Sequence, residues 1–230
     1  MAAVARTLAA TLAYCCRAAA PSSSRRLVRT QATLPPTRDV DGVATLLKDG
    51  AKCVVMLGAG ASVAAGLPDF RTPGTGLYDT LEISGLPYPE AVFELDFFRT
   101  NPQPFYELAK ALWPTDDSRP TKAHKLVKLL ADKNQLIRCY TQNIDSLERA
   151  AGVPAEYIVA AHGNFDSATC IATGEKVDAE ALRRAIEDGT TDSFNAQNGG
   201  LCKADIVFFG EALPDRFWAS LREDFDAAEL

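Results

Sequence analysis

Residues 52–78 read KCVVMLGAGASVAAGLPDFRTPGTGLY, and this stretch decides the fold class. The apolar run 53–57 predicts a buried parallel strand, because a strand covered on both faces is apolar at every position. Five small residues follow this run: Gly58, Ala59, Gly60, Ala61 and Ser62. Such residues let the backbone approach a diphosphate, and the free N–H groups at the start of a helix would favour its negative charge. The stretch therefore predicts a nucleotide-binding turn at the edge of an α/β sheet.

The turn differs from the usual dinucleotide fingerprint in two respects. That fingerprint has a third glycine where this chain has Val63, and the next glycine here is Gly66. In addition, no acidic residue stands about 20 positions further on, in a second strand, to hold a ribose. These differences disfavour an ordinary dehydrogenase.

Polar residues follow two further apolar runs, at the point where each predicted strand ends. The run 136–140 precedes the sequence TQNID (141–145), and the run 157–161 precedes His162 and Gly163. Open α/β sheets place ligand-binding groups at the carboxyl ends of their strands. Both groups are therefore expected on the same binding edge as the glycine-rich turn.

Together, GAGxS…GLPDFR…GLY, TQNID, HG and DIVFFGE (205–211) resemble the sirtuins, the NAD-dependent protein-lysine deacylases, in order and spacing. The sequences LPYPEAVFEL, TQNIDSLERAAG and HGNFDSATC between and around these motifs resemble the mitochondrial deacetylase branch most. The resemblance runs from about Asp39 to Leu230 and implies an α/β fold, with a Rossmann-like parallel sheet and a smaller helical lobe at about 163–204. It also implies removal of acetyl groups from protein lysines, with release of nicotinamide and O-acetyl-ADP-ribose.

The resemblance also implies roles for individual residues. His162 is the general base acting on a ribose hydroxyl, which suits an imidazole because its reference pKa of about 6.5 lies near working pH. Asn143 and Asp145 recognise the nicotinamide carboxamide, and Gln142 contacts the ribose. The full set implied to bind NAD is Gly58, Ala59, Gly60, Ala61, Ser62, Pro68, Asp69, Phe70, Arg71, Tyr78, Gln142, Asn143, Ile144 and Asp145.

Simpler structural interpretations of some of these residues stay open. Asp145 could cap the helix that follows it, and Arg71 could pair with Asp69. His124, in the first turn of a predicted helix, is interpreted as structural because nothing catalytic neighbours it in sequence. His162 could likewise be a hydrogen-bonded histidine at the end of a strand.

The segment 207–211 resembles the part of the family that pairs in an extended manner with the acyl-lysine peptide. Its residues are Val207, Phe208, Phe209, Gly210 and Glu211. Main-chain pairing tolerates varied peptide sequences, and the same residues could also form a buried strand. Branches that remove negatively charged acyl groups have Tyr followed three residues later by Arg, whereas Tyr78 is followed there by Leu81. The expected partners are therefore proteins carrying acetyl-lysine or another uncharged acyl-lysine.

Most family members hold a structural zinc ion with two C-x-x-C pairs between HG and FFGE. Here Cys170 keeps the first position, but Thr173 stands at the second. Asn195 and Asn198 replace the other pair, and Cys202 is out of register. Because a closed zinc site needs four ligands, no structural zinc is expected. A disulfide between the two cysteines is the other option, and a reducing compartment disfavours it.

Apolar residues at helical spacing predict the helices around the sheet. Thr121 is expected to cap one helix and Asp178 another, which would hold the small lobe without zinc. Phe93, Leu95, Phe97 and Phe98 indicate short helices laid over a groove, and plain core packing is the alternative for most of these aromatic residues. The predicted helices cover 40–48, the residues after 121, 146–151, 178–188 and 217–225.

Residues 1–38 differ in composition from the rest of the chain. They hold six arginines and no Asp, Glu or Lys, as in a mitochondrial transit peptide, so the mitochondrial matrix is the expected location. A disordered tail without an address is the alternative. The whole chain carries −6, so residues 39–230 carry −12, which disfavours a nucleic-acid partner. Arginines interrupt the apolar pieces, so no membrane span is predicted.

The sequence ends at Leu230, whereas family members continue into strands that contact the adenosine half of NAD. We therefore expect a truncated catalytic domain over 39–230, with an incomplete sheet and an unpaired edge. Two other functions stay open on this basis. One is a non-catalytic protein that binds NAD or an acyl peptide, and the other is a protein mono-ADP-ribosyltransferase.

Overall fold

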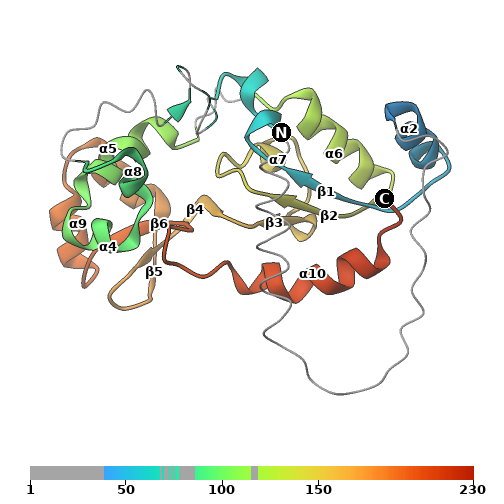
Figure 1. Cartoon of the computed structure of the whole chain (residues 1–230). Coiled ribbons are helices and arrows are strands. Elements are labelled where there is room, and N and C mark those ends of the chain that lie inside the picture. The colour runs from blue at the N-terminus through green and yellow to red at the C-terminus, as the bar shows by residue number, and fades with distance from the viewer. Residues whose placement is uncertain are drawn as a thin grey trace. The chain divides into compact units, whose positions relative to one another are not determined.

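The computed structural model describes residues 39–67, 69, 72, 74, 76–77, 86–114 and 119–230. Its first sheet is parallel, with strands in the order β1 (Cys53–Leu57), β2 (Leu136–Thr141) and β3 (Ile158–Ala160) (Figure 1). Leu57 pairs with Thr141, and Thr141 pairs with Ala160. The three strands therefore end side by side, which confirms the predicted α/β fold class and brings the ends of the predicted strands to one edge.

Helices cover both faces of this parallel sheet (Figure 1). On one face, Val127 and Leu130 pack against Cys139 of β2. On the other face, Phe217 packs against Tyr140, because successive strand residues point to opposite sides. The helices concerned are α2 (Val40–Lys48), α6 (Lys122–Asp132), α7 (Leu147–Ala150) and α10 (Asp215–Ala227).

A buried ion pair fixes α10 to the sheet. Asp224 accepts hydrogen bonds from Arg138 Nε at 2.8 Å, Arg138 Nη2 at 3.0 Å and the Tyr140 hydroxyl at 2.7 Å. Only 4% of Asp224 is exposed. Burial alone would raise the pKa of Asp224, but these hydrogen bonds outweigh it and hold that pKa below its usual value.

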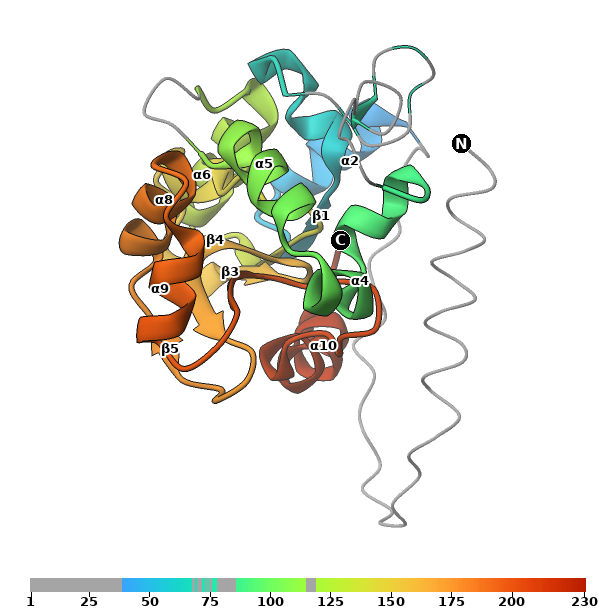
Figure 2. The same ribbon diagram turned by 90° about the vertical axis from the view of Figure 1, so that its left-hand side faces the viewer.

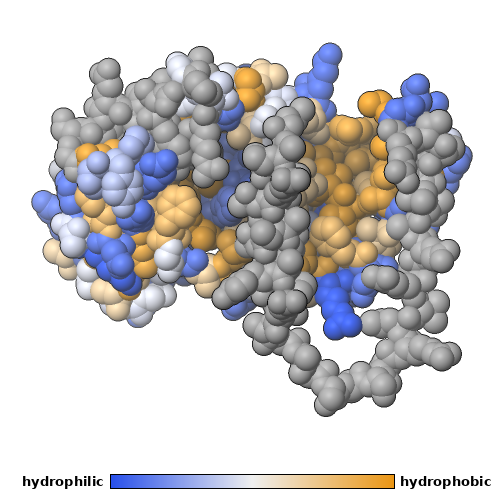
Figure 3. All heavy atoms as spheres, in the orientation of Figure 1, coloured by the Kyte–Doolittle hydropathy of each residue, from blue (hydrophilic) through white to orange (hydrophobic). Residues whose placement is uncertain are grey.

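The outer edge of β1 is partly covered by the last two residues. Val54 N donates to the Leu230 carbonyl at 3.0 Å, and Glu229 N donates to the Lys52 carbonyl at 2.9 Å. The expectation of an unpaired edge is therefore wrong for this part of β1. Figure 3 shows apolar surface in the region where Figure 1 draws this sheet and α10. Met56, further along β1, is 44% exposed.

A second, antiparallel sheet has the order β5–β4–β6. Its strands are β4 (Gly163–Cys170), β5 (Lys176–Val177) and β6 (Cys202–Ile206). The helices α4 (Leu95–Thr100), α5 (Gln103–Leu112), α8 (Ala179–Glu187) and α9 (Thr191–Gln197) belong to the same region, and Figure 2 shows α8 beside α9. The sequence predicted α8 with its Asp178 cap, which accepts from the amides of Glu180 and Ala181, but it did not predict the sheet.

Aromatic rings fill the core between these elements. Phe208 lies edge-on to Phe93, Phe98 and Phe105, with ring centroids 5.9, 5.7 and 4.8 Å away. All four rings are buried, so the aromatic residues predicted to cover a groove pack mainly into a core. Such edge-to-face contacts add to the stabilisation that burial provides.

Two local predictions are wrong. The glycine-rich turn leads into the short 3₁₀ turns Ala59–Ala61 and Val63–Ala65 instead of an α-helix, so the expected helix dipole is lacking there. Residues 207–211 form no regular strand, the alternative that their sequence had left open, and among the described residues Phe209 bridges to Glu94. Among the helices that the structure describes, none has the length and apolar character needed to cross a membrane.

Candidate functional site

The predicted motifs meet at the carboxyl edge of the parallel sheet, and a chain of hydrogen bonds joins them. Asn143 Nδ2 donates to the Gly58 carbonyl at 3.1 Å, which ties TQNID to the glycine-rich turn. His162 Nδ1 lies 3.0 Å from the Gln142 carbonyl. Val207 N donates to the His162 carbonyl at 2.8 Å, which ties the last motif to the third. Segments separated by up to about 150 residues in sequence therefore form one structural unit.

A cavity of about 530 Å³ lies beside these bonds. The predicted site residues that line it are Gly58, Ala59, Asp69, Gln142, Asn143, Ile144, His162 and all five residues of 207–211. Gly60, Ala61, Ser62 and Asp145 do not line it. Pro68, Phe70, Arg71 and Tyr78 lie outside the described residues, so their predicted contacts with the cofactor stay predictions.

The backbone of the glycine-rich turn is open to approach at two positions. Among the described residues, none lies within 4 Å of a Cβ atom built on Gly58 or on Gly60. Gly58 is extended, with φ −134°, and lies directly after β1. A phosphate could therefore approach the main chain here without displacing side chains.

His162 is held in a form that can accept a proton. The Gln142 carbonyl can only accept a hydrogen bond, so the ring hydrogen of the neutral imidazole lies on Nδ1 and the lone pair on Nε2. Burial lowers the pKa of His162, although the hydrogen bond to this carbonyl opposes that effect. The neutral imidazole is therefore favoured at neutral pH.

Gly163 has a geometry that only glycine can adopt here. Its φ is +66°, and a Cβ atom would lie 1.7 Å from the Asp205 carbonyl oxygen. Gly163 pairs with Ile206 at this point, so β4 and β6 meet directly beside His162. The glycine of the HG motif thus lets the chain pass from the parallel sheet into the second sheet.

Ser62 and Asp145 contribute to the site from behind the cavity. The Ser62 hydroxyl donates to Asp145 Oδ2 at 2.6 Å, and Asn143 Nδ2 donates to Ser62 Oγ at 3.1 Å. Asp145 Oδ1 accepts from the Leu147 amide at 2.9 Å, at the start of α7. Asp145 therefore caps the following helix, as its simpler interpretation expected. Its recognition of a carboxamide stays a prediction.

Two buried polar residues lie next to Asp145, and sequence reasoning did not bring them together. His124 is fully buried on α6, where Thr121 forms the predicted cap. Glu148, on α7, is 1% exposed and was not singled out at all. Burial lowers the pKa of His124, and it raises the pKa of Glu148 despite an opposing hydrogen bond with Thr141. The sequence contains one signal that His124 is buried: it lies three residues before the apolar Val127, on the same face of the helix.

The segment 207–211 is held in place by Lys203, which the sequence analysis did not single out. Lys203 is 4% exposed and donates to Glu211 Oε2 at 3.0 Å and to the Ile206 carbonyl at 2.6 Å. Glu211 Oε2 also accepts from the Phe208 amide at 2.7 Å. Burial lowers the pKa of Lys203, and the charge of Glu211 opposes that shift. Phe209 is left 53% exposed at the cavity.

The residues at the positions of the family's zinc ligands do not fit that ion. Cys170 and Cys202 are neighbours across β4 and β6, and both are free thiols. Burial and the neighbouring Cys170 raise the pKa of Cys202 to about 11. Asn195 accepts from the Cys202 amide at 3.0 Å, and Asn198 donates to the Phe194 carbonyl at 2.8 Å. The expected lack of a structural zinc stays a prediction, which metal analysis of the purified chain tests.

Known proteins resemble this chain over most of its length. Residues 58–230 match the family model described as "Sir2 family". The chain is 46% identical over 196 residues to the NAD-dependent protein deacetylase hst2 of Schizosaccharomyces pombe, a match covering 84% of this chain and 58% of that protein.

Two further relatives come from other organisms. Identity is 47% over 195 residues to the NAD-dependent protein deacetylase sirtuin-3 of Mus musculus, covering 82% of this chain and 56% of that protein. Identity to the NAD-dependent deacetylase sir2A of Dictyostelium discoideum is 47% over 187 residues, covering 79% and 36% respectively. In each case the match spans less than two thirds of the relative's own length.

Proposed function

The chain belongs to the Sir2 family, and from this premise we propose that it is an NAD-dependent protein-lysine deacetylase. In this proposal residues 39–230 form the catalytic domain, with the small lobe at about 163–204. Residues 1–38 act as a mitochondrial transit peptide, and the enzyme works in the matrix. The substrates are proteins that carry acetyl-lysine.

One observation carries the proposal: the position of His162. Its Nδ1 is held by the Gln142 carbonyl, and its ring lines a cavity that Gly58 and Phe209 also line. A neutral imidazole that shares a cavity with the glycine-rich turn and with segment 207–211 suits a base that acts where a nucleotide meets a peptide. The lowered pKa of His162 keeps that base unprotonated at neutral pH.

Bound NAD would supply a ribose that loses nicotinamide and accepts the acetyl group from lysine. The chain's own residues bind and orient the reactants. Gly58 and Ala59 offer main chain to the phosphates, and His162 takes a proton from a ribose hydroxyl at Nε2. Asn143, with Asp145 behind it, is proposed to recognise the carboxamide.

The segment 207–211 is proposed to orient the acyl-lysine peptide. The amides of Val207, Phe208 and Phe209 all donate within the chain, to the carbonyls of His162 and Phe93 and to Glu211. These bonds fix the course of the segment before a peptide arrives, which reduces the entropy lost on binding. The sequence after Tyr78 favours acetyl over succinyl groups, so faster removal of succinyl than of acetyl from matched peptides would contradict this part.

A single assay tests the function. The chain is incubated with NAD and an acetyl-lysine peptide, and nicotinamide release and acetyl loss are followed together, with the unacetylated peptide as control. The proposal expects both signals in equal amounts. Nicotinamide release with retained acetyl groups would indicate ADP-ribosyl transfer instead. Neither signal, together with measurable NAD binding, would indicate a non-catalytic binding protein.

A further inference from the structure

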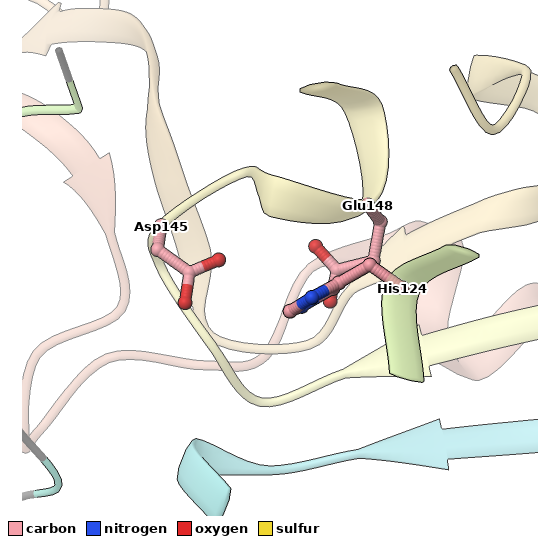
Figure 4. A group of neighbouring side chains, drawn as sticks. All are labelled: His124, Asp145 and Glu148. Carbon is pink, nitrogen blue, oxygen red and sulfur yellow. The ribbon is translucent and has the colours of Figure 1, made fainter. Parts of the chain in front are cut away.

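Three polar side chains gather in the interior behind the cavity, and the proposed reaction does not use them together. They are His124 on α6, Asp145 after β2 and Glu148 on α7 (Figure 4). One ring nitrogen and one oxygen from each carboxylate all lie within 4.8 Å of one another. Among the residues that the structure describes, no other His, Cys, Asp or Glu residues form such a group.

Two of these side chains have buried atoms that no protein group satisfies. His124 Nε2 and Glu148 Oε1 are both buried and have no hydrogen-bond partner. His124 is fully buried, and Glu148 is 1% exposed. A buried polar atom without a partner costs about 1–3 kcal/mol, and more when it is charged. Two such atoms, in side chains whose possible ligand atoms lie this close together, therefore indicate that something binds between them.

The hydrogen bonds around His124 indicate which kind of group that is. The Thr121 hydroxyl donates to the Ala61 carbonyl at 2.7 Å, so its single hydrogen is already used. His124 Nδ1 lies 2.9 Å from Thr121 Oγ1 and accepts from the Thr121 amide at 3.2 Å. Both contacts occupy Nδ1, so Nε2 is the ring atom left without a partner beside the two carboxylates. A cation bound there would use the lone pair of Nε2, with the ring hydrogen on Nδ1, where Thr121 Oγ1 can accept it.

We propose that His124, Asp145 and Glu148 form a reversible binding site for a divalent transition-metal ion such as Zn²⁺ or Co²⁺. One imidazole and two carboxylates suit these ions, whereas Mg²⁺ and Ca²⁺ prefer oxygen ligands alone. In the metal-bound form Nδ1 would donate to Thr121 Oγ1, 2.9 Å away, which is how metal-binding histidines are usually oriented by a second partner. This site is separate from the two thiols of the small lobe and does not depend on the proposed deacetylase activity.

The surroundings also provide a route for the ion. A cavity of about 260 Å³ is lined by Glu148, Thr141 and Asn143, among other residues, so solvent reaches the neighbourhood of the cluster. Asp145 keeps its bonds from Ser62 and Leu147, and each carboxylate oxygen has a second lone pair for a ligand. Because Ser62 follows the glycine-rich turn, a bound ion would also act on the nucleotide side of the molecule.

Cobalt titration of the chelator-treated full chain tests the proposal. We expect saturable binding of one Co²⁺ per chain with weak visible absorption, and competition by Zn²⁺. Glu148→Gln and His124→Gln should each weaken binding on the order of 100-fold. The exposed-residue control Glu187→Gln and the thiol control Cys170→Ser should bind like the wild type. No saturable binding to the folded wild type, or unchanged affinity in both cluster variants, would overturn the proposal.

X-ray absorption by the zinc-loaded wild type gives a second measurement that needs no variant. Nitrogen and oxygen ligands place scatterers at about 2.0–2.2 Å, whereas a thiolate lies at about 2.3 Å. We expect nitrogen and oxygen scattering alone. A sulfur shell would place the ion at the cysteines and refute the assignment. Neither experiment contains NAD or a peptide, so its outcome is independent of the deacetylase assay.

Discussion

Replacing Gly163 by alanine should destabilise the chain far more than a change of one methyl group suggests. The new Cβ would lie 1.7 Å from the Asp205 carbonyl oxygen, whereas ordinary contacts begin at 3.4 Å, so β6 must move by about 1.7 Å. That movement breaks the hydrogen bond from Val207 N to the His162 carbonyl, at about 1 kcal/mol. The φ of +66° adds about 1–2 kcal/mol for a residue with a Cβ. We expect a total loss of about 2–3 kcal/mol.

Gly189→Ala is the matched control for this prediction. Gly189 has φ +69°, but a Cβ there meets nothing within 4 Å, so it carries the backbone cost alone. Urea unfolding gives the free energy of unfolding of both variants. The signal is the fluorescence of Trp113, whose ring packs against Phe165 in β4. Equal losses of stability in the two variants would refute the argument from close approach. The rate of nicotinamide release by the Gly163 variant should also fall more than tenfold, because His162 moves with the strand.

Three further predictions concern other parts of the site and its support. Asp224→Ala should lower the free energy of unfolding by about 3 kcal/mol at pH 7, because Arg138 loses its buried partner. Since the pKa of Asp224 is lowered, this contribution should vanish as the pH falls through that lowered pKa. Urea titrations at several pH values measure the difference in the free energy of unfolding between wild type and variant. A difference that stays constant with pH would contradict the reasoning. Lys203→Met should raise KM for an acetyl peptide about tenfold by freeing Glu211, and an unchanged KM would contradict that role. The rate should fall only below about pH 6.5, as His162 Nε2 takes up a proton, and a decline that begins above pH 7 would argue against this base.

Local signals predicted much of the parallel sheet and its helices correctly. The apolar run 53–57 is β1, and Thr121 and Asp178 cap their helices as expected. These features depend on neighbouring residues, so a short window of sequence contains the information. The edge where Leu57 and Thr141 end side by side follows from the same rules, because parallel strands place their carboxyl ends together.

The parts that sequence did not predict depend on contacts between distant residues. Cys170 in β4 lies opposite Cys202 in the antiparallel strand β6. Neither the residues around Cys170 nor the sequence distance between the two cysteines indicates that these strands pair. The group of His124, Asp145 and Glu148 comes from separate elements that only the tertiary packing brings together. The turn after Gly58 was predicted to open an α-helix, and a repeat of small residues cannot distinguish that from the 3₁₀ turns observed.

The most direct test of the account compares the wild type with His162→Ala in one reaction mixture of NAD and an acetyl-lysine peptide. The wild type should release nicotinamide and lose acetyl groups in equal amounts, and the variant should still bind NAD but show neither signal. Full turnover by the folded variant, or acetyl loss from the wild type without NAD, would contradict the central claim that this imidazole acts as the base at the edge of the sheet.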